Sequence, residues 1–161
     1  MKAIKVLLIT TFLSSCTTDI DRSEEIVTQL KSGDKAYFNN LFSSREYDTL
    51  LDKIEHGNII LIRSSYLFLP WVDASTSLSL KYSLSRALIK NPDVVMNLVP
   101  KYFSVTDICT IPYIEESINV ELNHINASIV SLKELSGNNI TNSVLECISI
   151  YEKFKNNITK H

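Results

Sequence analysis

The segment ESINVELNHINASIVSLKEL, residues 116–135, has the most regular hydrophobic pattern in the chain. Its apolar positions are spaced by four, three, four and three residues: Ile118, Leu122, Ile125, Ile129 and Leu132. Side chains with this spacing lie on one face of an α-helix, because the helix makes one turn about every 3.6 residues. We therefore predict a long amphipathic helix here, followed by a turn at Gly137–Asn138–Asn139 and by a last helix with Cys147 on its buried face.

The same helical spacing recurs along most of the chain, whose 161 residues include only three glycines and four prolines. Residues that favour helix N-caps stand where the predicted helices begin: Ser23, Asp34, Asp73, Asn91, Ser104 and Ser143. Two of them match the capping-box pattern: Ser104 with Asp107 and Ser143 with Glu146. Gly33 and Gly57 are expected to end helices. The sequence predicts an all-α fold, a single compact bundle of short amphipathic helices, with HEAT-like helix pairs as the alternative.

One stretch, Ile59–Leu69, is ambiguous, because its two apolar runs are equally consistent with a buried strand. The helical patterns on both sides favour a helix that ends at Pro70. The next predicted helix, from Asp73 to about Lys90, has apolar residues on most of its faces. Such a helix is typically the buried centre of a bundle.

The first sixteen residues have the features of an export signal. Lys2 and Lys5 give a positive start, and the apolar run Val6–Leu13 is too short to span a bilayer. Small residues then precede a cysteine in Leu13–Ser14–Ser15–Cys16. This arrangement resembles the signal peptide and lipobox of bacterial lipoproteins. The alternative is an ordinary cleaved signal peptide in which Cys16 is an incidental thiol.

The resemblance to lipoproteins implies that the chain is cut before Cys16 and that this cysteine is acylated. It divides the chain into a signal peptide at 1–15, a lipidated tether at 16–22 and a helical domain at 23–161. At full extension the tether would reach about 25 Å. The lipid would hold the protein in the bacterial cell envelope, facing the periplasm. In that family the two threonines after the cysteine, where retained lipoproteins have an aspartate, favour the outer membrane over the inner one.

Length and charge also limit the function. Removing residues 1–15 from the 161 leaves 146, which is close to the commonest size of a single domain. Two of the 16 lysines and arginines leave with the signal, so 14 basic and 18 acidic side chains give a formal charge of −4. Basic residues are not clustered as a nucleic-acid surface would require, so we predict no nucleic-acid partner.

Cys109 and Cys147 remain as a pair in an exported chain. Thiols in an oxidising compartment usually form a disulfide, and two cysteines allow only one pairing. The alternative is two buried free thiols. A metal site is not predicted, because two cysteines and three scattered histidines lack the spacing of metal ligands.

A second resemblance covers about a quarter of the chain. Residues 84–95, LSRALIKNPDVV, are followed by Phe103, Asp107–Cys109 and Pro112–Tyr113. This pattern resembles one found in small exported proteobacterial proteins without an assigned function. It consists mostly of helix caps and core positions, so it implies a fold and no chemistry.

No catalytic or cofactor-binding residues are predicted, and no cofactor. Glu115 and Glu116 are adjacent, so on a helix they point in different directions and cannot act as a pair of acid and base. We expect His56 and His124 to have surface or capping roles. The serines lack a glycine-flanked nucleophile elbow, and no glycine-rich loop is present to hold phosphate.

The densest aromatic grouping surrounds Pro70 and includes Tyr66, Phe68 and Trp71. These three side chains either pack in the core or form a partner surface, for which large amphipathic rings are well suited. The leading hypothesis is a lipid-anchored periplasmic binding protein without catalytic activity, most concretely an immunity or inhibitor protein. The alternatives are an accessory subunit of an envelope assembly or secretion complex, and a peptidoglycan-active enzyme.

Overall fold

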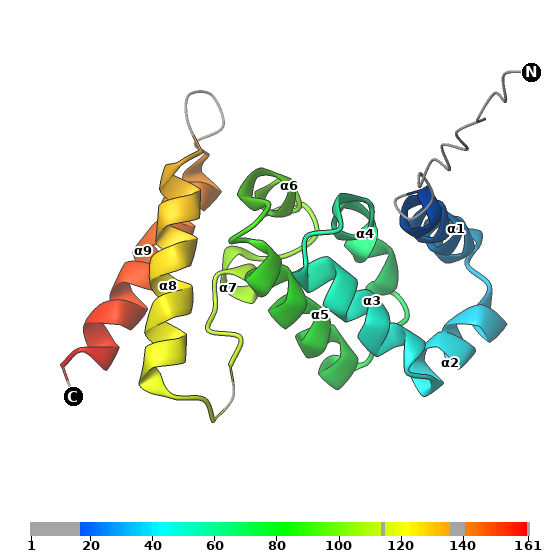
Figure 1. The fold of residues 1–161 in the computed structure, drawn as a ribbon, viewed down its shortest axis with the longest axis horizontal. Coiled ribbons are helices and arrows are strands. Elements are labelled where there is room, and N and C mark those ends of the chain that lie inside the picture. The colour runs from blue at the N-terminus through cyan, green and yellow to red at the C-terminus, as the bar shows by residue number, and fades with distance from the viewer. Residues whose placement is uncertain (1–16, 114, 136–140, 161) are drawn as a thin grey trace, which may run out of the picture.

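The helices pack side by side in one bundle, which confirms the predicted all-α fold (Figure 1). The computed structural model describes residues 17–113, 115–135 and 141–160. These ranges contain nine α-helices and one 3-10 helix: α1 Thr17–Ser32, α2 Lys35–Ser43, α3 Glu46–Glu55, α4 Ile59–Ser64, η1 Ser65–Phe68, α5 Ala74–Ala87, α6 Pro92–Met96, α7 Val105–Ile108, α8 Ile118–Lys133 and α9 Asn142–Ile158. Figure 1 shows α1 at one end of the long axis and the α8–α9 pair at the other, with α3 to α6 between them.

Three predicted caps are present. The Asp34 carboxylate accepts the backbone N–H of Ala36 at 2.8 Å, and Asp73 accepts that of Thr76 at 2.8 Å. Ser104 and Asp107 form the complete capping box at the start of α7. Each cap supplies an acceptor for a backbone donor that the first turn of a helix leaves without a partner.

Three other caps differ from the prediction. Ser23 is not a cap, because α1 begins at Thr17. Ser23 therefore lies within the helix, and it is completely buried. Thr141, rather than Ser143, caps α9 by accepting the N–H of Val144. Asn91 occupies the predicted N-cap position of α6, with Pro92 in the first turn, but its side chain makes no capping hydrogen bond; its side-chain amide donates instead to the carbonyl of Gly57 at 3.0 Å. Ser23 and Asn91 thus make long-range contacts in place of the predicted capping hydrogen bonds.

The start of α1 also changes the expected division of the chain. Residues 17–22, predicted as part of the lipidated tether at 16–22, belong to α1. Cys16 and the signal peptide predicted at 1–15 lie outside the described residues. The predicted turn at Gly137–Asn138–Asn139 lies outside them as well.

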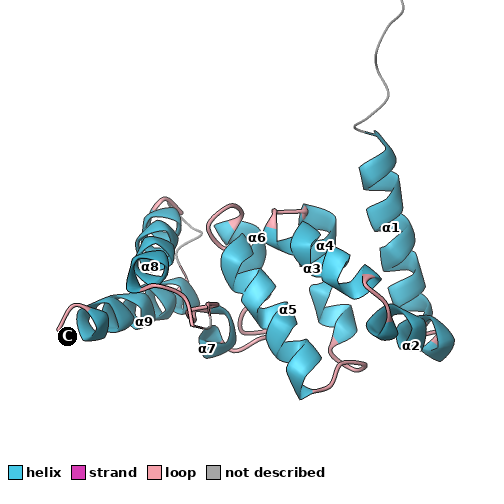
Figure 2. Cartoon of the chain, turned by 60° about the horizontal axis from the view of Figure 1, so that its bottom comes forward, coloured by secondary structure: helices cyan, strands magenta, loops and turns pink. Residues whose placement is uncertain are grey.

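The ambiguous stretch Ile59–Leu69 is helical, so the strand alternative is wrong. The predicted central helix is α5, which ends at Ala87 rather than near Lys90. Its C-terminal half is buried as expected, whereas Leu78 near its start is 45% exposed. Figure 2 shows this half of α5 surrounded by neighbouring helices and its first turns projecting beyond them.

Cys109 and Cys147 form the predicted disulfide between the end of α7 and the buried face of α9. Their Cα atoms lie 5.4 Å apart, and 38 positions separate the two residues in the chain. Closing a loop of this length stabilises the fold by about 4 kcal/mol in the chain-entropy model. The disulfide therefore fixes the C-terminal helix pair to the rest of the chain.

The buried face of α8 is displaced from the predicted stripe. Ile125, Ile129 and Leu132 are buried, but Ile118 is 59% exposed. The positions that complete the buried face are polar: His124, Ser128 and Ser131. An apolar spacing alone did not reveal them, because the hydrogen-bond partners of His124 and Ser131 come from distant segments.

Candidate functional site

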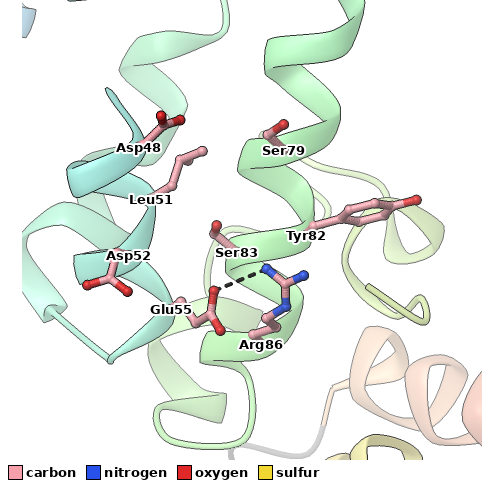
Figure 3. A pocket seen from close by; sticks show the side chains of 8 residues that line it. All are labelled: Asp48, Leu51, Asp52, Glu55, Ser79, Tyr82, Ser83 and Arg86. Carbon is pink, nitrogen blue, oxygen red and sulfur yellow. Dashed lines mark hydrogen bonds and ion pairs between the residues drawn. The ribbon is translucent and has the colours of Figure 1, made fainter. Parts of the chain in front are cut away.

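A groove of about 300 Å³ lies between α3 and α5 (Figure 3). Its walls are made by one face of each helix, and the lining residues are Asp48, Leu51, Asp52, Glu55, Ser79, Tyr82, Ser83 and Arg86. The two helices pack closely against each other along their length. The groove is thus held by rigid helical backbone on both sides.

Helical spacing explains why these side chains meet. Asp48, Asp52 and Glu55 are four and three positions apart, so they lie on one face of α3. The α5 residues that face them, from Ser79 to Arg86, follow the same spacing. The opposite face of α3 is anchored in the core, where Leu50 and Ile54 are buried. Burial of one face therefore sets the direction of the acidic face.

Arg86 closes one end of the groove. Its Nη1 donates to Glu55 Oε2 at 3.1 Å, as the dashed line in Figure 3 marks. Its Nη2 donates to the carbonyl of Pro112, and its guanidinium carbon lies 5.1 Å from the centre of the Tyr113 ring. Arg86 thus connects α3, α5 and the segment before α8. No described residue offers an acceptor to its buried Nε.

The lining residues carry more negative than positive charge. Three carboxylates face one guanidinium, which gives a formal charge of −2. Asp52 also lies 3.2 Å from Nδ1 of His56, the residue that directly follows α3, and both of these side chains are more than 60% exposed. An exposed pair of this kind contributes little to stability and is readily rearranged. The groove is therefore suited to a cationic group such as a lysine or arginine side chain.

A second polar cluster lies in the core around His124. Its Nε2 lies 3.4 Å from the hydroxyls of Ser85 and Tyr151 and 3.5 Å from that of Ser128. Burial lowers the pKa of His124 from 6.5 to about 4; a hydrogen bond to Thr110 acts in the opposite direction, and the charge of Arg86 lowers the pKa further. The surface or capping role predicted for His124 is wrong, because the side chain is only 3% exposed.

This cluster contains the hydroxyl and imidazole groups of a catalytic nucleophile–base pair, but the surroundings of these groups differ from those in a hydrolase. Hydrolases that use such a pair keep the nucleophile accessible and orient the imidazole through its other nitrogen. Ser85 and Tyr151 are completely buried, and His124 Nδ1 has no hydrogen-bond partner among the described residues. The cluster therefore joins structural elements in the core.

The predicted aromatic partner surface is only partly exposed. Phe68 is completely buried, so its assignment to a surface is wrong. Trp71 stacks on Phe38 with ring centres 4.2 Å apart, and Tyr66 stacks on Tyr102 at 4.1 Å. Tyr66 and Trp71 are thus half-buried against separate partners, and neither lines the groove between α3 and α5.

The other residues considered for chemistry do not come together. Glu115 and Glu116 are exposed in the segment before α8, and His56 lies at the end of α3. Across 17–113, 115–135 and 141–160, no three histidine, cysteine or acidic side chains gather as metal ligands. The helices in these ranges also lack the combination of length and hydrophobicity that a membrane span needs.

The sequence contains a weak signal for the groove. The spacing of Asp48, Asp52 and Glu55 is visible in the chain, and so is that of Ser79 and Arg86. The charged faces of two helices form a groove only when their other faces pack on a common core, which spacing does not reveal.

Comparison of the chain with protein-family models, with curated proteins and with solved structures finds no match.

Proposed function

We propose that the protein is a lipid-anchored binding protein of the bacterial periplasm, without catalytic activity, that captures a protein partner in the groove between α3 and α5. The observation that carries this proposal is the surplus of carboxylates in a groove of about 300 Å³ held by two packed helices. Its most concrete form is an immunity protein that blocks a toxin by binding a basic segment of it. Such blocking needs a rigid complementary shape and charge, and no chemical step.

Rigidity supports a role in binding. The acidic side chains project from α3, whose other face is fixed by Leu50 and Ile54, rather than from a loop. A site on rigid elements loses little conformational entropy when a partner binds. The buried disulfide from Cys109 to Cys147 further suits a chain that works outside the cytoplasm.

The proposed anchor rests on the lipobox-like sequence that ends at Cys16. Acylation of this cysteine would hold the protein at the envelope, with the outer membrane favoured over the inner one. Labelling of cells with radioactive palmitate should mark the wild-type protein and leave a Cys16→Ser variant unmarked. An unlabelled wild-type protein would contradict the lipid anchor while leaving the groove proposal open to its own test.

The groove is tested by neutralising its two carboxylates that do not pair with Arg86. An Asp48→Asn/Asp52→Asn variant should lose the protein that the wild type captures from an envelope extract, and wild-type capture should weaken as salt rises. The matched control is Glu116→Gln/Glu146→Gln, which removes two exposed carboxylates elsewhere. Equal capture by the groove variant and the control would contradict the proposed site.

The identity of the captured protein separates the functional alternatives. A secreted toxin would support the immunity role, whereas a component of an envelope assembly or secretion complex would support an accessory role. Zymography on cell-wall material tests the enzymatic alternative. A clearing band that the Glu116→Gln variant lacks would contradict a purely binding function.

A further inference from the structure

The α8–α9 pair is joined to the rest of the chain by side-chain hydrogen bonds. Ser131 of α8 donates to the carbonyl of Ile89 at 2.8 Å, and Tyr151 of α9 donates to that of Thr110 at 3.3 Å. Ser85 of α5 donates to the same Thr110 carbonyl at 3.0 Å and lies 3.3 Å from the Tyr151 hydroxyl. Figures 1 and 2 both place α7 between this pair and α5.

His124 lies at the centre of these contacts in a defined protonation state. The hydroxyls of Ser85 and Tyr151 both donate their hydrogens to the Thr110 carbonyl, so each hydroxyl oxygen presents a lone pair to His124 Nε2. We assign the imidazole hydrogen to Nε2 on this basis. Nδ1 is then a bare, buried nitrogen, and no described residue offers it a partner. A proton added at Nδ1 would have no acceptor.

The Thr110 carbonyl partly favours a positive charge on His124, but none of the described groups that face His124 carries a negative charge. From α5 it meets Ser85 and the charge of Arg86; from the segment before α8 it meets Thr110 and the Tyr113 ring. Ser128 faces it from α8 itself, and Tyr151 faces it from α9. Arg86 is the charged group that acts on it, and its sign is the same as that of an imidazolium. Protonated His124 is therefore stable only where water reaches it.

We propose that the α8–α9 pair is an acid-released arm: protonation of His124 separates the pair from α5 and Thr110, while the disulfide from Cys109 to Cys147 keeps it attached to α7. The site of separation follows from the contacts, because His124 lies where the pair meets the other elements. The body from α1 to α5 has no part in this cluster apart from Ser85 and Arg86. Its helices should therefore remain folded at a pH that releases the arm.

The test is amide hydrogen exchange of the oxidised wild-type protein at pH 7.5, 5.5 and 4.5. Exchange is compared with that of an unstructured peptide at each pH, so that only opening of the structure is measured. The opening of α8 and α9 should increase about tenfold per pH unit between pH 6 and 4.5, as expected for one proton taken up on opening. The opening of α3 should change far less. Parallel loss of protection in α3, α8 and α9 would overturn the proposal.

Two variants assign the effect to one histidine. His124→Gln keeps a hydrogen-bonding side chain without a titratable group, so exchange in α8 and α9 should lose its pH dependence. His56→Gln removes an exposed histidine and should behave as the wild type. A His124→Gln variant that retains the wild-type pH dependence would refute the proposed trigger.

A direct titration covers the case in which His124→Gln fails to fold. The imidazole nitrogen signals of His124 in the wild-type protein are followed by NMR from pH 8 to 4. The imidazole should stay neutral for as long as α8 and α9 remain protected. Protonation near pH 6.5 with the arm still closed would exclude His124 as the trigger.

Discussion

Arg86 and Glu55 form a 3.1 Å ion pair that joins α5 to α3 at the end of the acidic groove. The same guanidinium holds the Pro112 carbonyl and lies over the Tyr113 ring. One side chain thus connects the candidate binding groove with the segment that leads to α8. This arrangement makes Arg86 the natural first target for measurements of stability.

Replacing Arg86 with methionine should destabilise the fold by about 1–3 kcal/mol, because the Glu55 carboxylate and the Pro112 carbonyl would each lose a charged donor. Methionine keeps the length of the apolar stem, so the loss measures the guanidinium rather than packing. Urea unfolding followed by circular dichroism gives the free energy. Lys133→Met removes an exposed pair with Glu152 and should cost less than about 0.5 kcal/mol. Equal effects of the two changes would contradict this interpretation.

Stability should fall as the pH falls from 6.5 towards 4, and His124 should account for part of this fall. The folded state lowers the pKa of His124 from 6.5 to about 4, so the unfolded chain binds a proton at a higher pH than the folded one. The contribution of neutral His124 to the free energy of unfolding is fully present above pH 6.5. It falls by roughly 3 kcal/mol in total as the pH approaches 4. Urea unfolding at pH 7, 5.5 and 4.5 should show a flatter profile for His124→Gln than for the wild type. Identical profiles would rule out this linkage.

The disulfide should contribute about 2–4 kcal/mol, since it closes a 38-position separation. A Cys109→Ala/Cys147→Ala variant should unfold at a lower urea concentration than the oxidised wild type. Reductant should lower the midpoint of the wild type and leave that of the variant unchanged. A wild-type midpoint that does not respond to reductant would show that the bond adds nothing to stability.

Two glycines allow a matched comparison. Gly57 has φ +92°, and a Cβ there would lie 2.6 Å from Asn91 Nδ2, which donates to the Gly57 carbonyl. Gly33 has φ +69° but only a distant contact, 3.9 Å from Trp71 Cζ2. Gly57→Ala should therefore cost about 2–3 kcal/mol and Gly33→Ala about 1 kcal/mol, as measured by thermal or urea unfolding. A larger loss at Gly33 would contradict the steric argument.

Local features of the fold could be predicted from the sequence. Asp34, Asp73 and the Ser104–Asp107 box form caps because their partners lie two or three positions along the chain. Cys109 and Cys147 could be paired because, with Cys16 assigned to the predicted lipobox, no other cysteine was left for either of them. These predictions needed only the geometry of one helix or a count of residues.

Features that depend on tertiary partners could not be predicted. His124 and Ser131 are polar positions in an amphipathic helix, and they are buried because Ser85 and the Ile89 carbonyl meet them from elsewhere in the chain. Ser23 was expected to cap α1, yet it accepts a hydrogen bond from Asn58 across 35 positions. The groove likewise depends on the packing of α3 against α5. To predict any of these features, one must know which helix faces pack against each other. The periodicity within one segment does not provide this information.

The position of Thr17 at the start of α1 has a consequence for orientation. In a chain acylated at Cys16, helical backbone would begin one residue from the lipid, and the 16 residues of α1 would form a stiff rod about 24 Å long. The tilt of this rod against the bilayer would then set the direction in which the rest of the molecule faces. A partner would have to approach from a restricted range of angles, and inserting a glycine–serine spacer after Cys16 would remove that restriction without altering a single contact in the fold.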